Sequence, residues 1–223
     1  MRRGVVALSK VDRVDDDLAE LAELEVGEHL ESTSMADARI IRVSASDGTG
    51  LDRLRHELAR LLTSVEADDS DRPRMWIDRA FSITGAGTVV TGTLLDGRVS
   101  VGDDLRVWPI DRPARVRSIQ SHEQSTETAA PRRRVALNLS GVDRDDVVRG
   151  SMLGKSDQWV ASRRFHVSLQ TARYIEEITD RGAYHVHIGS GSWPGRVRVL
   201  DGSEAVITLD TALPLAMGDR FIL

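Results

Sequence analysis

Two short polar segments in the first third of the chain hold residue types that could recognise a purine base. Ser9-Lys10-Val11-Asp12 directly follows an apolar run, and so does Ser44-Ala45-Ser46. A carboxylate such as that of Asp12 can accept hydrogen bonds from both N1–H and the exocyclic amino group of guanine, whereas adenine offers no such donor pair. The aliphatic stem of Lys10 could lie on the ring, and the backbone N–H of Ala45 could reach O6. Together, the two segments therefore predict specificity for guanine.

The positions of the two segments, each directly after a predicted strand, are stronger evidence for a guanine site than their residue types. Each lies at the end of an apolar run, Val5 to Leu8 or Ile40 to Val43, which is typical of a buried parallel strand. Ligands of open α/β sheets bind at the carboxyl ends of such strands. Either segment alone is compatible with a solvated loop. As a pair they predict a guanine site formed by Ser9, Lys10, Asp12, Ser44, Ala45 and Ser46.

Two arginines further along the chain are candidates for binding an anion. Arg79 interrupts an alternating apolar pattern that runs from Met75 to Ile83, which predicts that its side chain lies on the inner face of a strand. An inward arginine is costly unless it is paired, so it either binds a carboxylate or points to a ligand. Arg134, the last of three consecutive arginines, begins an apolar strand and could enter the same pocket.

Three other patterns imitate known sites without meeting their requirements. Gly150 to Ser156 has three residues between its glycines where a phosphate-binding loop needs four, and no strand-to-helix turn surrounds it. Gly85 to Val90 lacks the third glycine of a dinucleotide-binding turn. His185 and His187 face one side of a strand but have no third clustered ligand. We therefore predict no phosphate loop, no metal site and no catalytic residue in this sequence.

The first 63 residues alternate between strand and helix patterns. Asp15-Asp16-Asp17 places carboxylates at the start of a helix, where the helix dipole favours them, and this helix is expected to bury Leu18, Leu21 and Ala22. Thr49 to Asp52 resembles a capping box that opens a second helix, with a leucine stripe from Leu51 to Leu62. Residues 1–63 are therefore expected to be part of a nucleotide-binding α/β domain.

The rest of the chain has the period of β-strands. Residues 64–73 hold almost no apolar side chain and end at Pro73, which is typical of a linker. Residues 74–157 and 158–223 each show short alternating strands separated by glycine turns. Gly102-Asp103 and Gly218-Asp219 each precede a strand and form a weak internal repeat. The predicted fold is an α/β remnant followed by two small antiparallel β-barrels, mostly β overall, with the second barrel incomplete.

Composition limits the cellular context. The chain has a net charge of −5 and no cysteine, which excludes disulfides and thiolate metal sites. Residues 1–73 hold 10 Lys and Arg against 17 Asp and Glu, while residues 74–157 hold 13 against 11, so RNA contacts would be sought in the mildly basic middle. No apolar stretch approaches the core of a signal peptide or a membrane span. A cytoplasmic protein without membrane contacts is expected.

Several of these segments occur in the order found in one protein family. Ser9 to Asp12, Ser44 to Ser46, Ile77 to Thr93, Arg134 to Gly141 and Arg149-Gly150 closely resemble the bacterial selenocysteine-specific translation elongation factor. The Val89-Val90-Thr91-Gly92-Thr93 part is shared by all relatives of elongation factor Tu. The start at Ile77-Asp78-Arg79, the Arg134 strand and the segment His185 to Gly189 favour the selenocysteine branch. The resemblance covers nearly the whole chain.

This resemblance implies a role in translation. The family uses GTP to deliver selenocysteinyl-tRNA to ribosomes that read a recoded UGA codon. The predicted guanine residues would hold the base of GTP, although Ser9 and Ser46 depart from the family's usual residues at their positions. Asp78, Arg79 and Arg134 would line the aminoacyl pocket. A selenol is more acidic than a thiol, whose pKa is about 8.5, so it is anionic at neutral pH and prefers arginine.

The resemblance also implies parts that these residues do not contain. The phosphate loop, the switch regions and the Mg²⁺ ligands of the family belong before residue 1, and the winged-helix domains that read an mRNA element belong after residue 223. Residues 1–63 would be the C-terminal part of the GTP-binding domain, and the chain alone is expected to be inactive as a GTPase. Two alternatives stay open. One is a general translational GTPase similar to elongation factor Tu, or a sulfate-activating GTPase; the other is a non-enzymatic barrel that binds RNA or protein.

Overall fold

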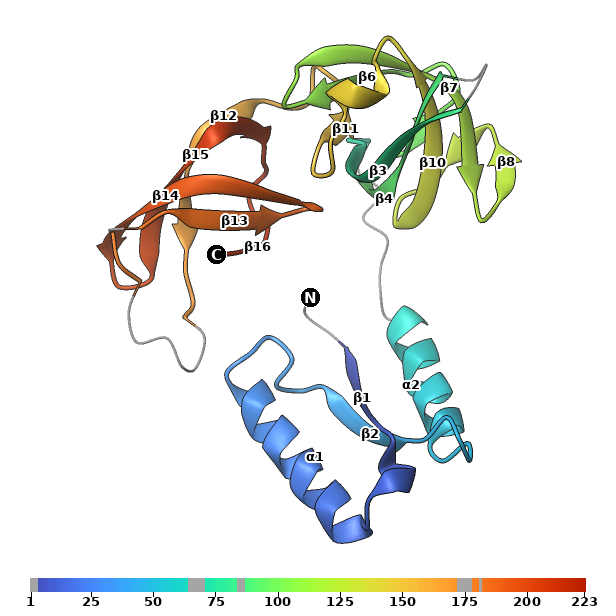
Figure 1. Cartoon of the computed structure of the whole chain (residues 1–223), viewed down its shortest axis with the longest axis vertical. Helices are drawn as coiled ribbons and strands as arrows, with labels where there is room; N and C mark the ends of the chain where they lie inside the picture. The colour runs from blue at the N-terminus through green and yellow to red at the C-terminus, as the bar shows by residue number, and fades with distance from the viewer. Residues whose placement is uncertain (1–3, 64–70, 84–86, 172–177, 181) are drawn as a thin grey trace. The chain divides into compact units, whose positions relative to one another are not determined.

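The computed structural model describes residues 4–63, 71–83, 87–171, 178–180 and 182–223. The chain divides into two compact units, the N-terminal unit Met1–Glu66 and the C-terminal unit Ala67–Leu223. Figure 1 shows both described α-helices in the N-terminal unit. Most of the predicted linker, residues 64–70, lies outside the described residues. Among the described residues, no helix is long and apolar enough to cross a membrane.

The N-terminal unit is a two-stranded parallel sheet with a helix after each strand. β1 (Val5–Ser9) pairs with β2 (Arg39–Val43), so that Ser9 lies opposite Val43. The short 3-10 turn η1 (Val11–Arg13) and helix α1 (Asp16–Glu31) follow β1, and α2 (Leu51–Thr63) follows β2. In Figure 1 the two helices lie on either side of the strand pair. This is the strand and helix order that the sequence pattern predicts.

Helix α1 begins as its acidic run predicts but buries a different face. The Asp15 carboxylate accepts a hydrogen bond from the Leu18 N–H at 2.9 Å and caps the helix. The expected burial of Leu18 and Leu21 is wrong, because their side chains are 50% and 60% exposed while Ala19 is buried. Ala19 is the buried residue of this helix, and a sheet of two strands is too narrow to cover the leucine face as well.

Helix α2 contains a buried carboxylate that two arginines hold. Glu57 is 4% exposed and accepts hydrogen bonds from the Arg39 guanidinium of β2 and from Arg60 Nε, the latter at 2.8 Å. The hydrogen bond from Arg60, with the charge of Arg39 beside it, lowers the pKa of the Glu57 carboxyl. Part of the expected leucine stripe is exposed, since Leu58 and Leu62 are 44% and 75% exposed. The contact between α2 and β2 is therefore ionic as well as apolar.

We expect the N-terminal unit to lose stability in acid through Glu57. Because its pKa is lower in the folded than in the unfolded protein, the ion pairs stabilise the fold fully above the ordinary value of 4.5 and are lost as the pH falls through the folded value. Replacing Glu57 with Gln should lower the melting temperature at about pH 7 and flatten its fall towards about pH 3. Thermal melts followed by the circular dichroism of the helices, recorded at each pH, measure the melting temperature and its dependence on pH. Glu28→Gln, at an exposed position of α1, is the control, and an equally steep fall in the Glu57 variant would contradict the assignment.

The first part of the C-terminal unit is a closed barrel of six strands. β10 (Arg133–Ser140) pairs with β4 (Gly87–Asp96) on one side and with β7 (Arg112–Ser121) on the other, which closes the order β10-β4-β3-β11-β6-β7. Inward side chains such as Ile77, Leu94 and Leu137 are fully buried. The other bounds are β3 Arg74–Ile83, β5 Val99–Ser100, β6 Asp104–Trp108, β8 Gln124–Thr126, β9 Thr128–Ala129, η2 Arg144–Asp146 and β11 Met152–Gly154.

The second part of the C-terminal unit is a curled antiparallel sheet of five strands, here called the second sheet. Its strand order is β12-β15-β14-β13-β16. Their bounds are β12 Ala161–Ser168, β13 Tyr184–Ile188, β14 Gly191–Asp201, β15 Glu204–Pro214 and β16 Phe221–Ile222. Val186, Ile207 and Leu213 are among its fully buried side chains. The predicted fold class is confirmed, with the second barrel present as a curled half-barrel.

The weak repeat at Gly102-Asp103 and Gly218-Asp219 corresponds to the same turn in both parts. Gly102 and Gly218 have φ angles of 91° and 89°, a region in which glycine avoids side-chain strain. The carboxylate of the following aspartate accepts a hydrogen bond from the backbone N–H three residues earlier, at 2.8 Å in both turns. The repeat therefore encodes one way of leading the chain into a strand.

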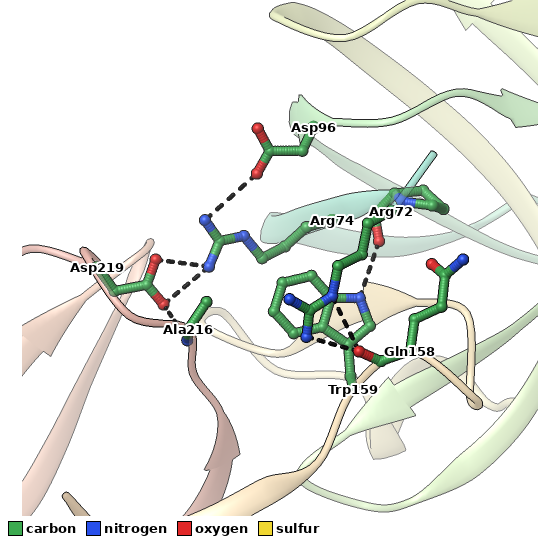
Figure 2. A network of polar contacts seen from close by, with 8 residues as sticks. Arg72, Arg74, Asp96, Gln158, Trp159, Ala216 and Asp219 are labelled. Carbon is green, nitrogen blue, oxygen red and sulfur yellow. Dashed lines mark hydrogen bonds and ion pairs between the residues drawn. The ribbon is translucent and has the colours of Figure 1, made fainter. Parts of the chain in front are cut away.

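A polar network joins the barrel to the second sheet (Figure 2). Arg74 of β3 donates from Nη1 to both carboxylate oxygens of Asp219, at 2.6 and 2.8 Å, and from Nη2 to Asp96 at 3.4 Å. The side chains of Arg74 and Asp219 are only 11% and 15% exposed. Arg72 stacks on the indole of Trp159, 3.8 Å from the ring centroid. The two sheets thus share a junction that buries an ion pair.

Candidate functional site

A β-bulge in β3 determines which residues reach the outside of the barrel. The register between β3 and β4 shifts between Ile77 and Arg79, which makes Asp78 the extra residue. Ile77 is fully buried, Arg79 is exposed, and Ala80 packs against the core. The prediction that Arg79 lies on the inner face is therefore wrong. A strict alternation from Met75 would place it there, but the bulge shifts the inner face by one residue.

Arg79 and Arg134 line the same hollow on the outside of the barrel. The hollow has a volume of about 360 Å³ and lies between β3, β4, β10 and the β7–β8 hairpin. Thr91 of β4 lies opposite Arg79 on one side and opposite Ala136 of β10 on the other, and this register brings the two arginine-bearing strands to one place. The lining includes Arg79, Phe81, Thr91, His122, Glu123 and Arg134.

The two arginines differ in their partners. Arg134 Nη1 donates a hydrogen bond to Asp78 Oδ2 at 2.6 Å, with the Asp78 side chain 27% and the Arg134 side chain 64% exposed. The Arg79 side chain forms no hydrogen bond or ion pair within the part of the chain that the structure describes. Asp78, the extra residue of the bulge, therefore orients the Arg134 guanidinium, while the charge of Arg79 is available to an anion.

The tip of the β7–β8 hairpin supplies another wall of the hollow. His122 and Glu123 have φ angles of 51° and 64°, so both central residues of this two-residue turn are left-handed, as the twist of a tight hairpin favours. Apart from glycine, this conformation is uncommon and occurs mainly at asparagine, aspartate and histidine. The turn lacks the Asn-Gly or Asp-Gly pair that marks such hairpins in a sequence, so neither lining residue was predicted. The two short strand patterns on either side of His122 were the available signal.

The predicted guanine residues lie at one edge of the parallel sheet. Since Ser9 is opposite Val43, the segments Lys10 to Asp12 and Ser44 to Ser46 leave their strands at the same edge. Lys10, with a φ of 64°, and Asp12 in η1 are exposed, as are Ala45 and Ser46. Ser44 is fully buried, and its Oγ accepts a hydrogen bond from the Ser46 N–H at 3.2 Å. The hydroxyl of Ser44 therefore shapes the loop instead of facing outward.

The loop after β2 is held by its own hydrogen bonds. The Asp47 carboxylate accepts a bond from the Thr49 N–H at 2.8 Å, and the bonds from Thr49 lower the pKa of the Asp47 carboxyl. The Asp47 N–H reaches Ser44 Oγ at 3.5 Å. Gly50, at a φ of 69°, leaves no room for a side chain, since a Cβ there would lie 1.9 Å from the Arg42 carbonyl oxygen. The backbone of Ala45 is thus presented by a preformed loop.

The structure also shows where the sequence patterns that only partly match known sites lie. The segment Gly150 to Ser156 contains β11, which lies between β3 and β6, and Lys155 Nζ is 3.5 Å from Asp71 Oδ1. Gly85 lies outside the described residues. His185 Nδ1 is 3.1 Å from Ser192 Oγ. Across the described ranges, no group of three or more His, Cys, Asp or Glu residues could hold a metal ion.

Comparisons with known sequences agree over the whole chain. Residues 87–154 match elongation factor Tu domain 2, and residues 162–223 match the β-barrel domain of the selenocysteine-specific elongation factor. The selenocysteine-specific elongation factor of Escherichia coli K12 is 37% identical over 219 residues, which cover 98% of this chain and 35% of that protein. The protein of the same name from Desulfomicrobium baculatum is 32% identical, with 100% and 37% covered. The chain thus spans about a third of the length of these relatives.

Solved structures show the same relationship. A crystal structure of a bacterial selenocysteine-specific elongation factor matches with a TM-score of 0.87 at 31% identity, over 99% of this chain and 37% of that chain. The elongation factor SelB from Methanococcus maripaludis, in complex with the GTP analogue GPPNHP, matches with a TM-score of 0.85 at 27% identity, over 97% and 54%. By its sequence and its fold, this chain belongs to the family of selenocysteine-specific elongation factors.

Proposed function

We propose that the protein takes part in delivering selenocysteinyl-tRNA to the ribosome in the cytoplasm, and that the hollow at Arg79 and Arg134 receives the selenocysteinyl group. The observation that carries this proposal is that Arg79, whose side chain has no partner among the described residues, lies beside an arginine that Asp78 orients. A selenolate is an anion at neutral pH, and arginine donates charge-assisted hydrogen bonds to anions. A serine hydroxyl is neutral and gains no such contact, so the hollow can select by charge.

The size and walls of the hollow suit a small side chain. Its volume of about 360 Å³ is near the lower end of ligand-binding pockets. Phe81, which is 40% exposed, offers apolar surface to a methylene group, and Arg79 and Arg134 supply positive charge to the same hollow. A general carrier of many amino acids would need an uncharged and larger space.

Binding of the protein to selenocysteinyl-tRNA and to seryl-tRNA tests this function. We expect at least a roughly tenfold preference for the selenocysteinyl form, because one charge-assisted hydrogen bond contributes about 1.5–3 kcal/mol. Fluorescently labelled tRNA allows both affinities to be measured in the same buffer. Equal affinities would contradict the proposal.

The edge of the parallel sheet is the second part of the proposal. Asp12 would accept hydrogen bonds from the guanine base of GTP, Lys10 would cover the ring, and the backbone of Ala45 would donate to O6. Their common edge and the preformed loop after β2 support this assignment. Hydrolysis of a bound GTP would supply the free energy for releasing the tRNA on the ribosome.

We expect the 223-residue chain itself to bind GTP only weakly, with a Kd on the order of 1 mM, and not to hydrolyse it. The sequence contains base-recognition residues but no phosphate-binding loop, and contacts to phosphates and Mg²⁺ supply most of the binding free energy. Isothermal titration and a phosphate-release assay measure the two properties. Asp12→Ala should abolish the residual binding and Lys155→Ala should not. Tight binding, or turnover that depends on Lys155, would contradict this reading.

A second candidate function is a general translational GTPase of the elongation factor Tu type. The match of residues 87–154 to elongation factor Tu domain 2 favours it, as does 45% identity over 89 residues to elongation factor 1-alpha of Pyrobaculum calidifontis. That likeness covers only 40% of the chain. Equal binding of selenocysteinyl- and seryl-tRNA would support this alternative.

A further inference from the structure

The second sheet contacts the barrel at the residue that precedes the bulge. Ser190, in the turn between β13 and β14, donates a hydrogen bond from Oγ to the Ile77 carbonyl oxygen at 2.7 Å. The Gly150 N–H donates to the same carbonyl oxygen at 2.9 Å, and the Ile77 N–H donates to the Ser151 carbonyl oxygen at 2.8 Å. The backbone of Ile77 is therefore bonded from the β11 side and from the second sheet at once.

The turn that carries Ser190 has little freedom on the barrel. Arg149 Nε donates to the Ser190 carbonyl oxygen at 2.9 Å. Gly150 and Gly191 pack so closely that a Cβ built on either would lie less than 3 Å from the Cα of the other, at 2.6 and 2.9 Å. Gly189 lies against the indole of Trp76, which a Cβ would meet at 2.2 Å. The hydroxyl of Ser190 is thus held at a fixed place relative to Ile77.

The Ile77 carbonyl belongs to the peptide group that leads into Asp78. Because a peptide group is planar, hydrogen bonds to its oxygen also restrict the direction in which Asp78 leaves it. Asp78 is the extra residue of the bulge and has no direct opposite residue in β4 to hold it. Its carboxylate nevertheless bonds the Arg134 guanidinium at 2.6 Å. Ser190 is therefore connected to the hollow in two steps: its hydroxyl bonds the Ile77 carbonyl, and the next residue, Asp78, bonds Arg134.

We propose that Ser190 is a positioning residue of the aminoacyl hollow: by bonding the Ile77 carbonyl it sets the bulge, and through Asp78 the orientation of Arg134. This inference rests on the proposed function for its effect on tRNA selection, but its structural part does not. It assigns to the second sheet a share in amino-acid specificity, although every lining residue of the hollow belongs to the barrel.

Three variants test the proposal. Ser190→Ala removes the hydroxyl, Ser190→Thr keeps it, and Ser192→Ala removes a hydroxyl of β14 that bonds His185 instead. In Ser190→Ala we expect faster amide hydrogen exchange at Asp78 and Arg79, and a preference for selenocysteinyl- over seryl-tRNA that is reduced about three- to tenfold, the range for one lost hydrogen bond. Ser190→Thr should restore both properties, and Ser192→Ala should leave both unchanged.

The two readouts separate this inference from the proposed function. Unchanged exchange at Asp78 and Arg79 in Ser190→Ala would overturn the positioning role whatever the tRNA result. Faster exchange with an unchanged preference would overturn the link to specificity. If the unmodified protein has no preference between the two tRNAs, the proposed function fails, while the exchange data still decide whether Ser190 holds the bulge. An equal weakening of both tRNAs with a lower melting temperature would make Ser190 merely structural.

Discussion

Replacing Arg79 with alanine should lower the affinity for selenocysteinyl-tRNA roughly ten- to a hundredfold and leave that for seryl-tRNA nearly unchanged. This range corresponds to about 1.5–3 kcal/mol, the contribution of a hydrogen bond between charged groups. Arg79 is exposed and has no partner among the described residues, so its removal leaves no protein charge uncompensated. The melting temperature should therefore hardly change.

The neighbouring arginine should behave differently. Arg134→Ala removes the partner of Asp78 and leaves a carboxylate free beside the hollow, where it would repel a selenolate. We expect a larger loss of selenocysteinyl-tRNA binding than in the Arg79 variant. Arg117→Ala, at an exposed position of β7 outside the hollow, is the control for general effects of positive charge on RNA binding. An equal loss for both aminoacyl forms in the Arg79 variant would show that Arg79 contacts the tRNA body instead.

Replacing Arg74 with methionine should lower the free energy of unfolding of the C-terminal unit by about 3–5 kcal/mol, the typical effect of removing one partner of a buried ion pair. Asp219 would stay buried without its guanidinium, although it keeps the hydrogen bond from the Ala216 N–H. The change also removes a cation 5.1 Å from the centroid of the Trp159 ring. Denaturant unfolding followed by tryptophan fluorescence measures the loss.

An exposed pair of the same barrel supplies the matched control. Arg106 bonds Asp111 at 2.7 Å, but the two side chains are 31% and 68% exposed, so Arg106→Met should cost only about 0–1 kcal/mol. In the double variant Arg74→Met with Asp219→Leu, part of the stability should return, because Asp219 no longer leaves a buried charge without its partner. The recovery should be incomplete, since the Ala216 N–H loses its acceptor. A loss below about 1 kcal/mol in Arg74→Met would mean that solvent reaches the junction, contrary to its burial.

The sequence predicted most of the fold because the fold depends on patterns that extend over many residues. Alternating apolar residues indicated the barrel strands, and the Asp15 run indicated the start of α1. The repeated Gly-Asp pair marked two turns with the same hydrogen bond. The ion pair that Asp219 forms with Arg74 could not be predicted from this pattern, since the two residues are 145 positions apart in the sequence.

The candidate site was less predictable because it depends on a single-residue irregularity. Arg79 and Arg134 line one hollow in the structure, but the sequence argument for Arg79 used a strict alternation that the bulge at Asp78 breaks. The pairing of Arg134 with Asp78 and the contribution of His122 depend on strand register and on a left-handed turn without glycine. The pairing leaves no local signal in the order of residue types, and the hairpin leaves only the short strand patterns on either side of His122. Ser190, which acts across two sheets, leaves no local signal either.

The most direct test of recognition by charge compares selenocysteinyl-tRNA with cysteinyl-tRNA across pH. When both amino acids are attached to the same tRNA, the two forms differ only in one atom. A thiol ionises near a pKa of about 8.5, whereas a selenol is already ionised at neutral pH. We expect a preference for the selenocysteinyl form of roughly tenfold or more near pH 7, which shrinks as the pH rises past about 8.5 and the thiol becomes anionic. A preference that stays constant across this range, or no preference near pH 7, would contradict recognition of the selenolate by Arg79 and Arg134.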